Sequence, residues 1–253
     1  MQQYNMLQAV PMSFYSARLY RDVALNWGGK AFVYLFLLLA IITLAFSLIA
    51  QHAVREGYDV FSDKIVPQIP VMNIAQGKIS TPENHPYYIT EPDSDKRIAV
   101  IDTSGQFKTP QEENVSLLIT GSSVIMAKKD ETRTFSIPAK LNGTFDPPVV
   151  SQAIMKYLGF VWLLFFIPML ALHYIYRILQ AMLYSIIGKF FAWISGTKLS
   201  YMHILPIALV ALTPTIVFFL VMIFIPVNIP VYVYFLISMA YLLFGVMANK
   251  TSH

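Results

Sequence analysis

The feature that most constrains the fold is a run of twenty residues, 31–50, without a charged side chain. A helix rises about 1.5 Å per residue, so this run matches a hydrocarbon core of about 30 Å. Residues 157–176, 203–223 and 231–247 also lack Asp, Glu, Lys and Arg. The sequence therefore predicts a membrane α-helical bundle with about four transmembrane helices.

A polar insert separates the first two spans. The charged residues concentrate between 51 and 150, although only 13% of all residues are charged. Short β-branched or aromatic runs in the insert are separated by Pro, Gly, Asn and Asp, as is typical of strands and turns. These runs cover 69–75, 87–90, 96–102, 115–120, 123–128 and 132–137. We expect residues 51–156 to form a small extracytoplasmic β-rich (α+β) domain, built as an antiparallel sheet or a sandwich, with 51–66 continuing the first helix.

Three flanking segments complete the chain. Residues 1–30 carry an apolar stripe at helical spacing, which predicts either an amphipathic helix on the cytoplasmic membrane surface or a helix that packs on the other helices. Residues 177–202 follow the second span without room for a turn, and one helix over both would be about 60 Å long, twice the bilayer core. We expect an interfacial or cytoplasmic helix there, with a third crossing as the competing prediction. Residues 248–253 are expected to form a short cytoplasmic tail.

The distribution of basic residues predicts the orientation. With both termini cytoplasmic and four crossings, seven basic residues and one acidic residue, Asp22, face the cytoplasm, whereas the insert holds eleven basic and thirteen acidic residues. The positive-inside rule favours this assignment, because it weighs Lys and Arg near span ends and discounts a long translocated domain. A fifth crossing would move Lys198 and Lys250 outside, which the rule disfavours.

The residue types that usually carry chemistry form no recognisable site. There are no cysteines and the five histidines are scattered, so the sequence predicts neither a metal nor a cofactor site. The spans lack Asp, Glu, Lys and Arg, which argues against an ion-coupled transporter. The basic residues form no single patch, so we expect no nucleic-acid partner. Because no nucleotide-binding, phosphate-binding or protease fingerprint is present, we expect no enzyme.

One loop of the insert, residues 102–105, can be interpreted as a protease motif or as a structural turn. The run Asp102-Thr103-Ser104-Gly105 differs from the Asp-Thr-Gly of aspartic proteases by one inserted residue, and no second copy completes the catalytic pair of carboxyls. Asp and Gly in this order are typical of a turn closed by the Asp side chain. We therefore predict a structural hairpin turn built on Asp102, Thr103 and Gly105.

Small residues recur in the membrane half of the chain. Gly188, Ala192 and Gly196 stand at intervals of four, which places them on one face of a helix. Small residues at this spacing let two helices approach closely. We expect this face to pack against another helix, either in an oligomer or within the monomer.

Several segments spread over most of the chain carry a family resemblance. They are SFYSARLYRDVALNWGGKAFVYL at 13–35, IPVMNIAQGKIS at 69–80, AVIDTSG at 99–105, SLLITGSSVIM at 116–126, RILQAMLYSIIGK at 177–189, KLSY at 198–201 and ALTPT at 211–215. Through them the sequence resembles the DUF1189 family of bacterial membrane proteins, which are distantly similar to Yip1-like membrane proteins. The resemblance implies a protein of the bacterial cytoplasmic membrane with an extracytoplasmic domain, and Yip1-like proteins often have five spans.

Two function classes fit these features. The first is a non-catalytic accessory or scaffold subunit, whose extracytoplasmic domain binds a partner protein and whose helices pack against a membrane-protein partner or a second copy of the chain. The second is a lipid- or amphiphile-binding or transport protein, because uncharged helices interrupted by proline can form a lipid-facing groove. A stable co-purifying protein would favour the first class, and ordered lipid between the last hydrophobic segments would favour the second.

Overall fold

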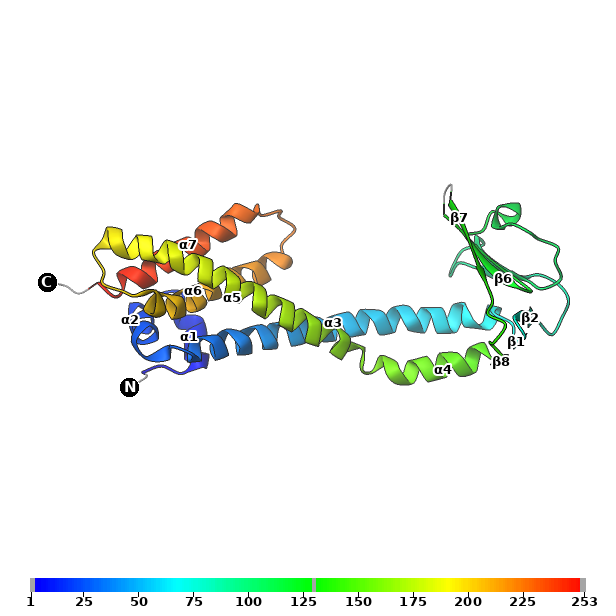
Figure 1. The fold of residues 1–253 in the computed structure, drawn as a ribbon, viewed down its shortest axis with the longest axis horizontal. Coiled ribbons are helices and arrows are strands. Elements are labelled where there is room, and N and C mark those ends of the chain that lie inside the picture. Colours follow the sequence, from blue (N-terminus) through cyan, green and yellow to red (C-terminus); the bar gives the residue numbers. More distant parts are fainter. Residues whose placement is uncertain (1–2, 129–130, 251–253) are drawn as a thin grey trace. The chain divides into compact units, whose positions relative to one another are not determined.

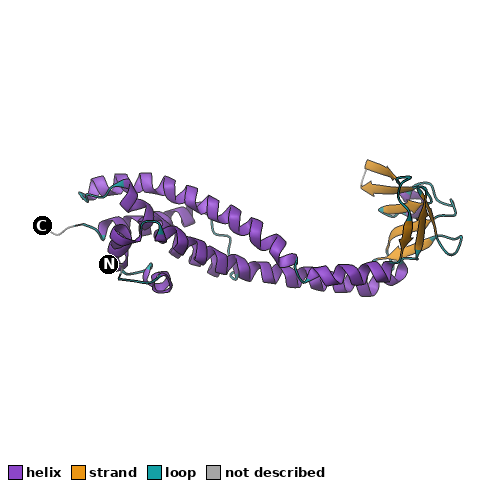
Figure 2. Ribbon diagram, turned by 60° about the horizontal axis from the view of Figure 1, so that its bottom comes forward, coloured by secondary structure: helices purple, strands orange, loops and turns teal. Residues whose placement is uncertain are grey.

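The computed structural model describes residues 3–128 and 131–250 and consists of two compact units. Residues 1–47 and 164–253 form the first, which we call the membrane unit, and residues 48–163 form the second, the β-rich unit. All strands in the described part of the chain belong to the β-rich unit (Figure 2).

Apolar helices make up most of the membrane unit (Figure 1). They are α3 (Lys30–Lys64), α5 (Val161–Ser195), α6 (Tyr201–Ile223) and α7 (Val231–Met247), of which α3 beyond residue 47 and the first residues of α5 belong to the β-rich unit. The first three are long and apolar enough to cross a membrane, and α7 is a shorter apolar helix of 17 residues. The β-rich insert lies between α3 and α5 in sequence. The predicted fold class is therefore confirmed, and the chain is a multi-pass membrane protein.

Two of the helices extend beyond the predicted spans. α3 continues without interruption from residues 31–50 to Lys64. α5 continues through residues 176–178 to Ser195 without reversing, so a separate crossing at 178–195 would need a turn that this helix does not contain. The expected second span, 157–176, is itself divided, because α4 (Pro147–Leu158) ends just before α5 begins.

The N-terminal segment packs on the other helices of the membrane unit. It forms α1 (Met6–Met12), α2 (Ala17–Asp22) and a π-helix, η1 (Val23–Trp27). Leu19, Tyr20 and Trp27 of its apolar stripe are fully buried in a core shared with α6 and α7, whereas Phe14 is exposed. The buried part of the stripe therefore packs on the other helices of the unit.

Asp22 holds this segment together. Its carboxylate accepts hydrogen bonds from the backbone N–H groups of Gln3 and Tyr4 and from the side chains of Asn26 and Trp27, at 2.7–3.2 Å. Burial disfavours the charged carboxylate, but these hydrogen bonds outweigh burial and hold the pKa of Asp22 below its ordinary value. The carboxylate is thus fully occupied by structural hydrogen bonds.

Two sheets form the β-rich unit. The strand order is β2-β1-β8 in one and β3-β4-β5-β6-β7 in the other. Their bounds are β1 (Met72–Ala75), β2 (Lys78–Ser80), β3 (Tyr87–Thr90), β4 (Arg97–Asp102), β5 (Leu117–Thr120), β6 (Ser123–Lys128), β7 (Glu131–Ser136) and β8 (Gly143–Phe145). Short 3-10 helices, η2 (Val66–Gln68) and η3 (Pro110–Glu113), link α3 to β1 and β4 to β5. Ile79, Ile89 and Ile101 belong to the main hydrophobic core of this unit.

Two predictions for the insert are wrong. The larger sheet is not purely antiparallel, because β4 and β5 pair in parallel, with Ala99 opposite Leu117. The turn at residues 102–105 is consequently not a hairpin, since parallel strands need a longer connection and the chain passes through η3 before it enters β5. The helix α4 was also not predicted, although Asp146 caps its first turn by accepting a hydrogen bond from the Val149 N–H.

Candidate functional site

The loop after β4 is organised by Asp102. The side chain of Asp102 is fully buried, and it accepts hydrogen bonds from the N–H and hydroxyl of Ser104 and from the N–H of Phe107, at 2.5–2.9 Å. Burial raises the pKa of Asp102, but these hydrogen bonds have the larger combined effect and hold it below its ordinary value. The hydroxyls of Thr103 and Thr81 are hydrogen-bonded at 2.6 Å, and Gly105 adopts a positive φ of 82°. Asp102 and Thr103 thus have structural hydrogen bonds, and Gly105 has a backbone conformation that favours glycine.

The small residues of α5 do not share one role. A Cβ atom at Gly188 would lie 2.5 Å from the Ile204 side chain of α6, so this glycine allows close packing within the monomer. Ala192 is buried in the same core. Gly196 ends the helix instead: its φ is 68°, and the Thr197 N–H donates to the Ala192 carbonyl at 2.8 Å, as in a Schellman cap. Gly188 and Ala192 thus pack inside the monomer, whereas Gly196 forms the end of the helix.

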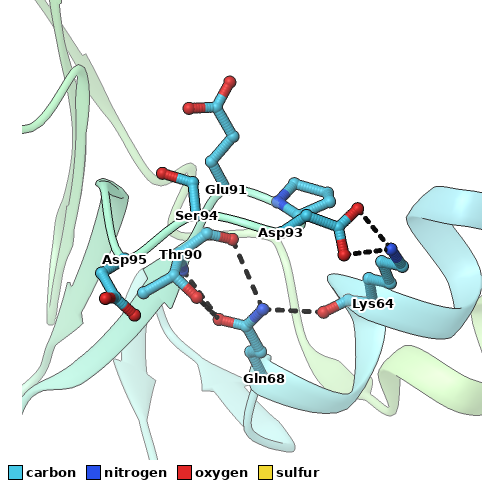
Figure 3. A pocket seen from close by; sticks show the side chains of 8 residues that line it. Lys64, Gln68, Thr90, Glu91, Asp93, Ser94 and Asp95 are labelled. Atoms are coloured by element: carbon cyan, nitrogen blue, oxygen red, sulfur yellow. Dashed lines mark hydrogen bonds and ion pairs between the residues drawn. The ribbon is translucent and has the colours of Figure 1, made fainter.

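An open pocket of about 370 Å³ lies where α3 meets the loop between β3 and β4 (Figure 3). The Gln68 side-chain carbonyl accepts hydrogen bonds from the N–H and hydroxyl of Thr90, and its amide donates to the Lys64 carbonyl at 2.7 Å. Lys64 also pairs with Asp93 at 2.5 Å, but both side chains are exposed, so the pair adds little stability. The carboxylates of Glu91 and Asp95 point away from Lys64 (Figure 3). The pocket is therefore a joint between a helix and a loop.

A second joint holds α3 against α4 within the β-rich unit. The Tyr58 hydroxyl of α3 donates to the Ser151 carbonyl at 3.1 Å, and the Ser62 and Ser151 hydroxyls are hydrogen-bonded at 2.8 Å. Ser151 is buried, and its hydrogen bonds are partly buried. Together with Gln68, this contact attaches the sheets to a pair of helices.

The most unusual polar group of the membrane unit is the guanidinium of Arg177, in the middle of α5. It donates to the Gln180 side-chain carbonyl at 2.8 Å, and the Gln180 amide donates to the Tyr184 hydroxyl at 2.8 Å. The Nε atom of Arg177 is buried and has no hydrogen-bond partner among the described residues. These three residues form a polar row on a helix that is otherwise almost entirely apolar.

A pocket of about 360 Å³ opens beside this row, between α5, α6 and α7. Thr215 and Phe219 line it from α6, whereas Val231, Tyr234 and Phe235 line it from α7. Its lining is therefore apolar and aromatic, apart from the polar row of α5 and the Thr215 hydroxyl. The Thr215 hydroxyl is already bonded to Ser238 at 2.8 Å.

Within the described part of the chain, no carboxylate forms an ion pair with Arg177. Asp22 is the only acidic residue in the sequence of the membrane unit, and its four hydrogen bonds use it elsewhere. A guanidinium removed from water without a counter-ion is costly, and buried charges are normally paired. The pocket therefore offers a cation that an anion from outside the chain can neutralise.

This site was not predicted from the sequence, where Arg177 is a basic residue just beyond an expected span. The available signal was the spacing of Arg177, Gln180 and Tyr184, at i, i+3 and i+7, which puts three polar groups on one face of an apolar helix. Among the described residues, no group of three or more His, Cys, Asp or Glu side chains is placed to hold a metal ion.

The comparison with protein families gives one match. The model of the family described as "Protein of unknown function (DUF1189)" matches residues 7–246. The chain belongs to the DUF1189 family. The match includes the loop of Asp102, the joint at Gln68 and the Arg177 pocket, and it confirms the resemblance predicted from the sequence. No curated protein and no solved structure matches this DUF1189 chain.

Proposed function

We propose that this DUF1189 protein is a non-catalytic accessory or scaffold subunit of a membrane complex, and that its β-rich unit binds a partner protein. The observation that carries the proposal is strand β7, at the edge of the five-stranded sheet. β7 pairs with β6 and, within the described part of the chain, with no other strand, and every residue of β7 is exposed.

The edge of β7 fits an extended segment of another protein. An edge strand presents backbone N–H and C=O groups that a partner strand can pair with, and neighbouring side chains then supply specificity. Phe135 of β7 is 53% exposed and lies opposite Val124, and Met126 on β6 is 49% exposed. Phe135 thus lies on the edge strand itself, and Met126 is a second exposed apolar side chain on the neighbouring strand.

The two joints described above support the same role. Gln68 and Ser151 attach the sheets to α3 and α4, and α3 continues into the membrane unit as one helix. A docking surface needs a defined support, and partly buried hydrogen bonds hold the sheet on these helices.

We further propose the location of the docking surface. The excess of Lys and Arg at the helix ends of the membrane unit favours a cytoplasmic N-terminus, and it favours an extracytoplasmic position for residues 51–156 in a bacterial cytoplasmic membrane. The partner would then be another protein of that membrane or of the space outside it.

A capture experiment tests the proposal. The full chain with a C-terminal tag is extracted from native membranes in a gentle detergent and analysed by native gel and mass spectrometry. We expect one partner in fixed ratio, lost in Phe135→Asp but retained in Leu141→Asp, a control whose exposure, 49%, is close to that of Phe135. A chain that runs alone, or equal capture by both variants, would contradict the proposal.

The Arg177 pocket favours a second candidate function, the binding of an amphiphile by the membrane unit. A cation in an apolar pocket matches a molecule with an anionic head and an apolar body. This function does not exclude the first, because the two use different units of the chain.

A further inference from the structure

We propose that the pocket beside Arg177 is a binding site for the phosphate headgroup of an anionic phospholipid. The inference specifies the ligand of the second candidate function, and it uses no residue of the β-rich unit. If no partner protein binds at β7, the lipid proposal still stands. If no lipid binds at Arg177, the partner proposal still stands.

The first argument is charge. Arg177 stays protonated under all ordinary conditions, and the sequence of its membrane unit contains a single acidic side chain, Asp22, which is occupied by four hydrogen bonds. The bound group must therefore supply the negative charge that the unit itself lacks.

The second argument is hydrogen-bonding capacity. Arginine carries five N–H donors in a planar fork that matches phosphate oxygens in pairs. The hydrogen bond to Gln180 uses one nitrogen, Nη1, whereas Nε is buried without a partner among the described residues. Gln180 is itself held by its bond to Tyr184, so the guanidinium is oriented before a ligand arrives. The geometry fits an acceptor with several oxygens.

The third argument is the apolar lining. Phe219, Val231 and Phe235 surround the polar row, and Val231 at the start of α7 is 82% exposed. Free inorganic phosphate would gain nothing from these side chains, whereas the glycerol backbone and first acyl carbons of a lipid would cover them. The lining therefore favours phosphate carried by a lipid.

The absence of acidic residues also selects among lipids. A zwitterionic headgroup brings an ammonium group, and none of the described residues that line the pocket carries a carboxylate to pair with it. An anionic headgroup brings the negative charge that neutralises Arg177 and no ammonium group. We therefore expect phosphatidylglycerol to bind more tightly than phosphatidylcholine.

The test uses the full chain, delipidated in a maltoside detergent, with short-chain dioctanoyl lipids counted by native mass spectrometry. We expect one dioctanoyl phosphatidylglycerol per chain, and binding at least about ten-fold weaker in Arg177→Gln, which is the loss typical of a charge-assisted hydrogen bond. Lys198→Gln removes one exposed positive charge from the same unit and serves as the control, with binding unchanged.

A second variant keeps the test decisive if Arg177→Gln does not fold. Val231→Trp fills the pocket at an exposed position while leaving Arg177 in place, and we expect it to weaken lipid binding several-fold. Equal binding of dioctanoyl phosphatidylcholine, displacement of the lipid by an equal concentration of inorganic phosphate, or undiminished binding in both pocket variants would overturn the proposal.

Discussion

The guanidinium of Arg177 donates a hydrogen bond of 2.8 Å to the side chain of Gln180, one turn further along the same apolar helix. This contact orients the cation but does not neutralise it, because Gln180 is uncharged. The membrane unit therefore holds the guanidinium of Arg177 in one orientation but does not supply its counter-ion.

One consequence concerns stability. In detergent without anionic lipid, we expect Arg177→Gln to unfold at the same temperature as the wild-type chain or at a higher one, because no carboxylate loses a partner and a partly buried charge is removed. Thermal unfolding followed by circular dichroism measures this. A fall of more than about 5 °C, which in a domain of this size corresponds to a loss of more than about 1 kcal/mol, would show that Arg177 has a structural partner.

A second prediction concerns the packing of α7. A Cβ atom at Gly245 would lie 2.6 Å from the Ile207 side chain and 2.7 Å from the Tyr20 ring. We expect Gly245→Ala to destabilise the membrane unit by about 1–3 kcal/mol, as overpacking does in dense cores. The matched control is Gly57→Ala in the exposed part of α3, where nothing lies within 4 Å and alanine should stabilise the helix by about 0.5–1 kcal/mol. Equal effects of the two variants would contradict this packing.

A third prediction concerns acid. Because the pKa of Asp102 is lowered in the folded chain, the unfolded chain takes up the proton first as the pH falls. The stability from Asp102 is therefore fully present above pH about 4 and is lost below it. Asp102→Asn should cost about 1–3 kcal/mol at neutral pH, since its NH₂ group would face an N–H donor, and should weaken the acid dependence of denaturant unfolding. Asp95→Asn, at an exposed loop position, is the control and should change neither.

A fourth prediction concerns topology. The chain has no cysteine, so single cysteines can be labelled without background. With an extracytoplasmic insert and four crossings, a membrane-impermeant maleimide should label Ser94→Cys in intact cells. It should label Lys198→Cys only after the membrane is opened. Labelling of Lys198→Cys in intact cells would instead support a fifth crossing.

The apolar helices and most strands could be predicted from the sequence, because composition and side-chain period act locally. The run YYIT at residues 87–90 is β3, and residues 123–128 are β6, with the predicted bounds. The parallel pairing of β4 with β5 could not be predicted in this way. It depends on the connection through η3 and on the fit of Ala99 against Leu117, which are properties of the folded chain.

The candidate site was harder to predict for the same reason. Arg177 has the same local sequence signal as any basic residue at the end of a span, and only the approach of Phe219 and Val231 from α6 and α7 makes it line a pocket. Gly245 was likewise unremarkable until Tyr20 was seen to occupy the space that its missing side chain leaves. Contacts between distant segments decide both cases.

The most direct test of the central claim, that the edge of β7 binds a partner protein, is site-specific photo-crosslinking in native membranes. A photoreactive phenylalanine analogue is placed at Phe135 or, as a control, at Leu141. The account predicts one covalent adduct with a single partner protein at Phe135 and none at Leu141. No adduct at Phe135, or the same set of adducts at both positions, would contradict it.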